Sequence, residues 1–97
     1  MMLTDMLHGK VAMITGGGRG IGEASARRLA EYGTKVILAD LNLSAAQGVA
    51  DDINAQGGQA KALEFNVAAF DTIPAKVAEA KELFGRIDIL VNVAGIT

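Results

Sequence analysis

A glycine-rich segment, residues 15–22, contains the residue types that could bind a phosphate group through the backbone. Its sequence is Thr-Gly-Gly-Gly-Arg-Gly-Ile-Gly, and it lies between a short apolar run and a segment of helical period. Gly16 permits a tight turn, Gly20 has no side chain to keep a pyrophosphate from the helix N-terminus, and Gly22 lets the helix lie close to the strand. The N–H groups and the dipole of the first helical turn would then bind the phosphates. Glycines alone are equally consistent with an ordinary loop. The strand before and the helix after favour a diphosphate-binding turn.

Asp40, at the end of the next apolar run, is the second residue suited to this chemistry. It follows the glycines at about the 20-residue separation typical of an acidic residue that accepts hydrogen bonds from an adenosine ribose. The alternative is a solvated loop carboxylate. A 2′-phosphate within about 4 Å of this carboxylate would be repelled by roughly 4 kcal/mol per unit charge at an effective dielectric constant of about 20. Asp40 therefore favours NAD over NADP.

Arg19 has the opposite effect, because a guanidinium beside the glycines could pair with a 2′-phosphate. An exposed pair of that kind is worth only about 0–1 kcal/mol, and Arg19 is equally consistent with a solvated loop cation. Leu41 supplies no second cation. We therefore predict NAD as the cofactor, with NADP less favoured. The residues predicted to bind it in this part of the chain are Gly16, Gly18, Arg19, Gly20, Ile21, Gly22, Asp40 and Leu41.

The composition excludes several other classes of site. There is no Cys, which excludes disulfides and thiolate metal sites, and the lone His8 makes a zinc site unexpected. The formal net charge of −2 gives no reason to expect nucleic acid or an anionic membrane as partner. The glycine-rich segment lacks the Gly-Lys-Ser/Thr of an NTP-binding loop. No apolar run has membrane-spanning length, and residues 1–10 lack the apolar stretch of a signal peptide. We expect a cytoplasmic protein with a small-molecule substrate.

Apolar runs alternate along the chain with segments of helical period. We expect strands over residues 11–14, 35–39, 59–65 and 87–93, and helices over 21–32, 43–53 and 73–84. The predicted buried stripes are Ile21, Ser25 and Leu29 in the first helix, Leu43, Ala46, Ala50 and Ile53 in the second, and Ile73, Val77, Ala80 and Phe84 in the third. Ser44 and Asp71 are the expected caps of the second and third helices, with Pro74 in the first turn of the third.

Strands that alternate with helices predict an α/β fold with a parallel sheet and helices on its faces. If the third right-handed crossover returns over the first strand, the order is 3-2-1-4, a Rossmann-type doubly wound sheet. The mixed third strand suits an edge. A crevice then opens between the first and fourth strands at their C-terminal ends. Residues 1–9 are expected to form a weakly ordered lead-in, and residues 10–97 the N-terminal part of a dinucleotide-binding domain.

Three motifs together resemble the classical short-chain dehydrogenases/reductases. They are the glycine-rich segment 15–22, Asp40 after the second strand, and Asn-Val-Ala-Gly at 92–95, and the stretch 84–92 is also similar to that family. The resemblance spans nearly the whole chain. It implies an NAD(H)-dependent oxidoreductase that transfers hydride between the nicotinamide and a small alcohol, ketone or oxoacyl substrate. It also implies a dimer or tetramer of identical subunits.

The resemblance implies further cofactor contacts. Asn66 and Val67 stand where the family usually has Asp-Val beside the adenine, and an Asn oxygen can still accept from the adenine amino group. Asn92, Ala94 and Gly95 match the family's Asn-Asn-Ala-Gly motif, with Val in place of the second Asn. A purely structural role for Asn92, and a turn role for Asn66, are equally consistent with the sequence.

The catalytic Ser, Tyr and Lys of the family have no counterparts in this sequence. The only tyrosine, Tyr32, ends the first helix and is followed four residues later by Val36, so we expect it to pack. The resemblance places the catalytic residues beyond Thr97. An apolar fourth strand at an open edge also suggests part of a longer protein. The alternatives are a non-catalytic dinucleotide-binding module and a fragment that is inactive in isolation.

Overall fold

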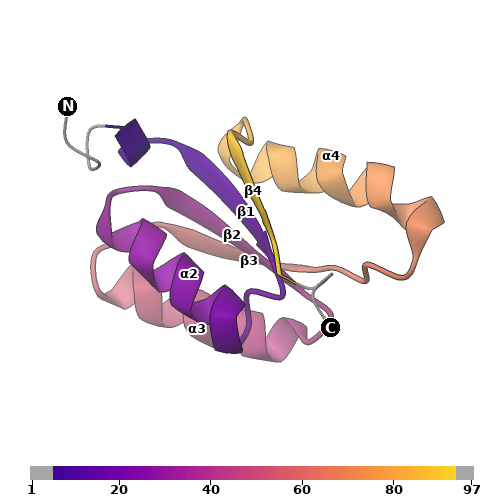
Figure 1. The fold of residues 1–97 in the computed structure, drawn as a ribbon, viewed down its shortest axis with the longest axis horizontal. Coiled ribbons are helices and arrows are strands. Elements are labelled where there is room, and N and C mark those ends of the chain that lie inside the picture. The colour runs from indigo at the N-terminus through magenta and orange to yellow at the C-terminus, as the bar shows by residue number, and fades with distance from the viewer. Residues whose placement is uncertain (1–5, 94–97) are drawn as a thin grey trace.

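The computed structural model describes residues 6–93 and forms one parallel sheet with helices on both faces (Figure 1). In chain order the elements are β1 (Val11–Thr15), α2 (Gly20–Glu31), β2 (Lys35–Asp40), α3 (Leu43–Ala55), β3 (Ala60–Glu64), the 3-10 turn η1 (Phe70–Thr72), α4 (Ile73–Phe84) and β4 (Ile89–Asn92). None of the helices in the described part of the chain is long and apolar enough to span a membrane.

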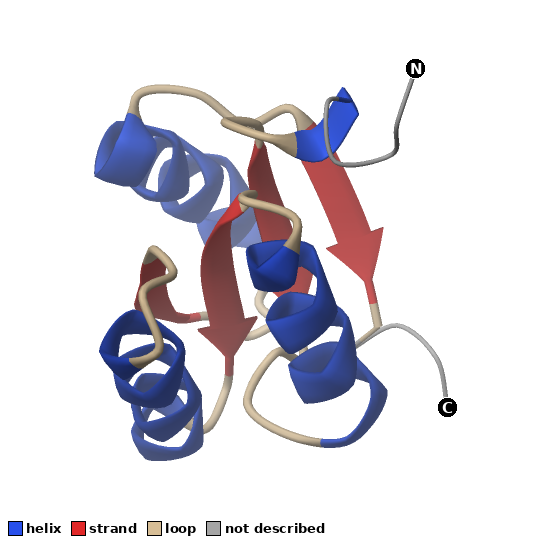
Figure 2. Ribbon diagram, turned by 90° about the vertical axis from the view of Figure 1, so that its left-hand side faces the viewer, coloured by secondary structure: helices blue, strands red, loops and turns tan. Residues whose placement is uncertain are grey.

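The strand order is β3-β2-β1-β4, and every neighbouring pair is parallel. This confirms the predicted order and the Rossmann-type arrangement. The two crossovers through α2 and α3 run one way along the sheet, and the crossover through α4 returns over β1. Helices α2 and α3 therefore lie on one face and α4 on the other (Figure 2).

The core has two layers because alternate residues of the central strands point to opposite faces. One cluster packs against α2 and α3, and its strand residues include Ala12, Ile14, Val36 and Leu38. The other lies on the α4 face, and its strand residues include Val11, Met13, Ile37 and Ala39. Strand β1 is buried throughout and β2 at its four inner positions, which explains their uninterrupted apolar sequences.

The predicted buried stripe of α2 is wrong at Ile21, whereas Ser25 and Leu29 are half-buried. The helix buries Gly22 and Ala26, whereas Ile21 is 67% exposed. Leu29 is half-buried and packs against the core cluster on the α2 and α3 face of the sheet. The physical reason is that the smallest residues permit the closest approach to β1, so they face the sheet although they contribute little to a hydrophobic pattern.

The predicted helix starts also need correction. Asn42, not Ser44, caps α3, because its side chain accepts a hydrogen bond from the backbone N–H of Ala45. Asp71 does not cap α4, since it lies inside the turn η1 and the helix begins at Ile73 without a side-chain cap. Pro74 lies in the first turn of α4, as predicted.

Two predicted stripe residues are more exposed than expected. Leu43 and Val77 are each 41% exposed, and Val49 takes the buried position in α3 instead. Leu43 is the first residue of α3 and lies outside the contact with the sheet. Val77 and the exposed β4 residue Leu90 line the same groove between the sheet and α4.

The segment before β1 is attached to the turn between α2 and β2. The Gly9 N–H donates to the Gly33 carbonyl at 3.0 Å, and the Thr34 hydroxyl donates to the Leu7 carbonyl at 3.0 Å. Residues 6–9 of the predicted lead-in are thus bonded to the domain.

Candidate functional site

The C-terminal ends of β1, β2 and β4 meet at one edge of the sheet. Thr15, the last residue of β1, pairs with Ala39 of β2 on one side and with Asn92 of β4 on the other. The glycine-rich turn follows Thr15, and Asp40 ends β2. The structure therefore brings the two main predicted features, the turn and the carboxylate, to the same edge, at the point where the chain direction across the sheet reverses.

The turn packs tightly against the start of α2. Gly16 has φ 73°, a left-handed conformation that favours glycine, and its N–H donates to the Ala39 carbonyl at 2.7 Å. A Cβ on Gly22 would lie 2.6 Å from the carbonyl carbon of Gly16 and 3.0 Å from the Cα of Gly17, and it would overlap the Gly16 carbonyl oxygen. Gly22 therefore sets the distance between the helix and the turn, whereas the sequence predicted a close approach of the helix to the strand.

The N-terminus of α2 offers unbonded N–H groups. The first helical hydrogen bond runs from Glu23 N–H to the Arg19 carbonyl at 3.3 Å, so the N–H groups before it have no acceptor within the helix. Arg19 is the N-cap residue and makes no side-chain cap. Gly20 has φ 62°, and the space where its Cβ would stand is open. Such an end suits an anion.

Asp40 lies against the glycine-rich turn. One carboxylate oxygen, Oδ2, accepts from the Gly18 N–H at 2.9 Å, and the other, Oδ1, accepts from the Asn42 N–H at 2.9 Å. Leu41, the next residue, is exposed, and so is Arg19, which forms no ion pair within residues 6–93. The carboxylate is thus at the same edge of the sheet as the glycine-rich turn, and the sequence pattern gave no sign of its bond to Gly18.

Thr15 belongs to the site, although the sequence analysis assigned it no role. Its hydroxyl donates to the Asn92 side-chain oxygen at 2.9 Å and lies 3.5 Å from the Val91 carbonyl. The bond joins the ends of β1 and β4. It supports the structural interpretation of Asn92, because the amide oxygen of that residue is used within the sheet. Ala94 and Gly95, also predicted to contact the cofactor, lie outside the described residues.

Asn66 has its side-chain oxygen engaged in a local turn after β3. The oxygen accepts from the Ala68 N–H at 2.9 Å, and the Asn66 carbonyl accepts from the Ala69 N–H at 3.1 Å. This is the turn role that the sequence left open. Val67 lines an apolar groove of about 600 Å³ between the sheet and α4, which Thr15 and Asn92 also line at its edge.

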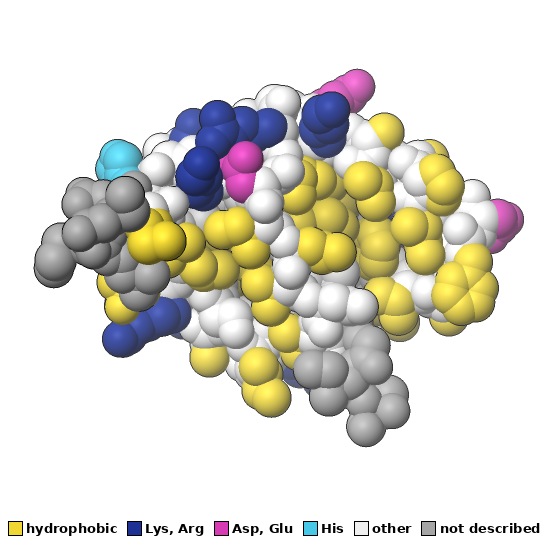
Figure 3. Space-filling view, turned by 45° about the horizontal axis from the view of Figure 1, so that its top comes forward, with side chains coloured by type: hydrophobic (Ala, Val, Ile, Leu, Met, Phe, Trp, Pro, Cys, Tyr) yellow, Lys and Arg dark blue, Asp and Glu magenta, His cyan; other side chains and the backbone are white. Residues whose placement is uncertain are grey.

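This groove opens on the face that carries β4 and α4. Figure 3 shows the hydrophobic side chains gathered there. Phe70 and Leu90, which line the groove, are 77% and 63% exposed.

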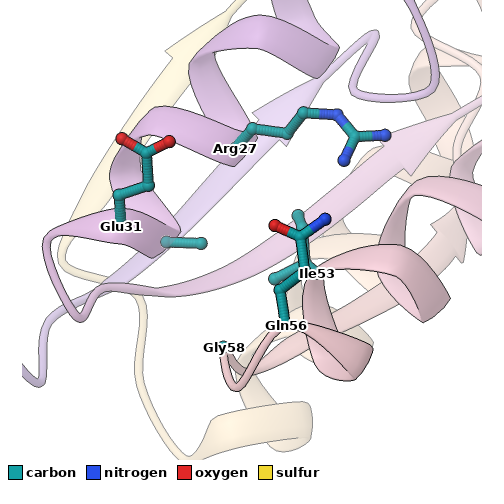
Figure 4. Close-up of a pocket in the computed structure, with 6 residues that line it drawn as sticks. Arg27, Glu31, Ile53, Gln56 and Gly58 are labelled. Atoms are coloured by element: carbon teal, nitrogen blue, oxygen red, sulfur yellow. The ribbon is translucent and has the colours of Figure 1, made fainter.

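A second, smaller cavity of about 120 Å³ lies between α2 and the C-terminal end of α3 (Figure 4). Arg27 and Glu31 from α2 line it opposite Ile53 and Gln56. The Arg27 guanidinium pairs with Asp52 and Glu23, and these hydrogen bonds raise the Arg27 pKa above its ordinary value. Arg27 therefore joins the two helices and leaves no free charge for a ligand.

Tyr32 is the C-cap residue of α2, at the end of the helix away from the glycine-rich turn. The Arg28 guanidinium lies 5.6 Å from the centre of its ring. Tyr32 thus lies at the other end of α2 from the glycine-rich turn. This agrees with the expectation that Tyr32 packs.

Sheet order and site together define a Rossmann-type α/β chain with a glycine-rich turn between its first strand and an uncapped helix N-terminus. A family model described as short chain dehydrogenase matches residues 10–97. The chain belongs to that family.

Relatives that match this chain are named as dehydrogenases. The 2,5-dichloro-2,5-cyclohexadiene-1,4-diol dehydrogenase of Sphingobium indicum is 44% identical over 94 residues, 97% of this chain and 38% of that protein. The cyclohexanol dehydrogenase of an Acinetobacter species is 42% identical over 95 residues, 98% of this chain and 38% of that protein. The chain thus spans 38% of the length of these two relatives.

Solved structures show the same fold. A hydroxysteroid dehydrogenase from Escherichia coli superposes with a TM-score of 0.84 at 41% identity, covering 89% of this chain and 37% of that one. A 3-ketoacyl-(acyl-carrier-protein) reductase from Brucella melitensis, solved in complex with NADH, gives 0.77 at 40% identity, covering 87% and 33%.

Proposed function

We propose that this chain is the cofactor-binding part of an NAD(H)-dependent oxidoreductase that interconverts an alcohol and a ketone or oxoacyl group. The observation that carries the proposal is the uncapped start of α2, open at Gly20, with the Asp40 carboxylate beside it. The NADH complex of the Brucella reductase supports a nicotinamide cofactor. Relatives named as dehydrogenases of a cyclohexadiene diol, of cyclohexanol and of a 7α-hydroxysteroid support a carbinol substrate.

Several of the predicted residues have a direct role in this proposal. The N–H groups from Gly20 to Gly22 bind the diphosphate, and Asp40 accepts from the adenosine ribose. Leu41 and Val67 flank the adenine. The cofactor supplies the hydride chemistry, and the chain's own residues bind and orient it.

The preference for NAD rests on charge. Asp40 is only partly buried, so the roughly 4 kcal/mol of repulsion toward a 2′-phosphate is an upper value that solvent reduces. Arg19 is exposed, and its side chain can rotate toward such a phosphate. An exposed ion pair between the two contributes about 1 kcal/mol at most. Repulsion by Asp40 therefore outweighs attraction by Arg19.

A non-catalytic role for the 97 residues alone is the second candidate. It is favoured by the position of Tyr32, which cannot reach a ligand in the crevice from the far end of α2. In that case the chain binds the dinucleotide and the chemistry requires residues from outside it.

Calorimetric titration with NADH and NADPH tests the proposal. We expect NADH to bind more tightly to the wild-type protein. The double variant Asp40→Asn/Leu41→Arg removes the charge but keeps an oxygen that can accept from the Gly18 N–H. It should bind NADPH at least about tenfold more tightly than the wild type does, a change of about 1.4 kcal/mol. The control is Asp51→Ala, which removes a carboxylate from α3 that accepts from Gln47, away from the crevice. No binding of either nucleotide would overturn the dinucleotide site, and tighter binding of NADPH to the wild type would overturn the NAD preference.

A further inference from the structure

We propose that Asp40 also positions the glycine-rich turn, so that one carboxylate both selects the cofactor and shapes the diphosphate site. The inference rests on the proposed function for its ligand but not for its geometry. The Gly18 N–H donates to Asp40 Oδ2 at 2.9 Å in a partly buried setting. Gly18 is itself buried in the turn. A backbone N–H in that position needs an acceptor, and Asp40 supplies it.

The turn has little room beside Asp40. A Cβ on Gly18 would lie 2.9 Å from Asp40 Oδ2, 3.0 Å from the backbone nitrogen of Ala46 and 3.1 Å from the Cβ of Ala45. The Gly18 peptide is therefore held between the carboxylate and the first turn of α3. The other atoms around this position are the backbone nitrogen of Ala46 and the short side chain of Ala45. We therefore expect the turn to follow a change in the position of the carboxylate.

The second carboxylate oxygen extends this contact to the next helix. Asp40 Oδ1 accepts from the Asn42 N–H at 2.9 Å, and the Asn42 side chain accepts from the Ala45 N–H at 3.0 Å. The bond to Asn42 is exposed, so water can replace it, whereas the bond to Gly18 is partly buried. Loss of the Gly18 bond is thus the more damaging of the two.

A positioning role for Asp40 would also affect the binding of ligands that contact the turn but contain no ribose. If Asp40 acted on the ribose alone, its replacement would change their binding only through charge. If it positions the turn, a replacement that lacks an acceptor weakens their binding further. Asp40→Asn and Asp40→Ala separate these effects, because both remove the same charge and only Asn keeps an oxygen that can accept from Gly18.

The experiment measures binding of inorganic pyrophosphate to the wild type and to both variants. We expect Asp40→Asn to bind pyrophosphate roughly threefold to tenfold more tightly than Asp40→Ala, the range for one hydrogen bond. Equal affinities of the two variants would overturn the positioning role. Circular dichroism of each variant confirms that both are folded.

Amide hydrogen exchange at Gly18, followed by NMR without ligand, gives a second readout. We expect slow exchange in the wild type and in Asp40→Asn, and fast exchange in Asp40→Ala. Exchange in the wild type as fast as in Asp40→Ala would overturn the inference. If the wild type binds no pyrophosphate, the exchange rates alone decide whether Asp40 positions the turn. The proposed function fails only if the wild type binds neither NADH nor NADPH.

Discussion

Replacing Gly22 with alanine tests the tightest contact in the site. The new Cβ would lie 2.6 Å from the carbonyl carbon of Gly16 and 3.0 Å from the Cα of Gly17, against a normal carbon separation of about 3.5–4.0 Å. Both neighbours are backbone atoms, so no side chain can rotate away, and α2 must move by about 1 Å. Overpacking of this kind costs about 3 kcal/mol, and the better helix propensity of alanine returns at most about 1 kcal/mol. We expect the free energy of unfolding to fall by about 2 kcal/mol.

Urea unfolding followed by circular dichroism measures this loss, and Gly48→Ala is the matched control. Gly48 lies within α3 with no atom within 4 Å of where its Cβ would stand. That substitution should raise the free energy of unfolding by about 0.5–1 kcal/mol. The displaced helix should also weaken NADH binding in Gly22→Ala and not in Gly48→Ala. A Gly22→Ala protein as stable as the wild type would refute the close-packing argument.

Two further predictions concern a helix cap and a charged strand end. Asn42→Ala should lower the free energy of unfolding by about 1 kcal/mol, as measured in urea, whereas Ser44→Ala should change it little because Ser44 is not the cap. Hydrogen bonds from Arg86 and from a backbone N–H hold the pKa of Asp88 below its ordinary 3.8. Its stabilising effect is therefore complete above that value and lost as the pH falls through the lowered pKa. The thermal midpoint of Asp88→Asn should lie below that of the wild type at neutral pH and converge with it in acid.

The sheet order could be predicted because strand burial leaves a direct sequence signal. Central strands have both faces covered, and β1 is accordingly an unbroken apolar run, while the exposed Lys61 and Glu64 mark β3 as an edge. The face of α2 could not be predicted in the same way. The hydrophobic pattern favours Ile21, whereas the helix buries Gly22 and Ala26. Only the glycine motif indicates a close contact at Gly22, and that contact is with Gly16 and Gly17 of the turn.

The candidate site was predicted in part. The glycines and Asp40 are found from their spacing, which fixes where each lies along the strands and helices. Contacts such as Asp40 with Gly18, or Thr15 with Asn92, depend on side-chain rotamers and on strands far apart in sequence. Local spacing carries no information on either.

The parallel topology explains why opposite charges meet in this crevice. Strand C-termini and helix N-termini lie at the same edge of such a sheet, so the partial positive charge of the first turn of α2 faces the crevice together with the negative Asp40. In the proposed function, the first attracts a diphosphate and the second repels an additional phosphate on the ribose. The same carboxylate accepts from Gly18, so the two effects cannot be varied independently. A productive change toward NADP therefore requires both the removal of the charge at Asp40 and a new acceptor for the Gly18 N–H.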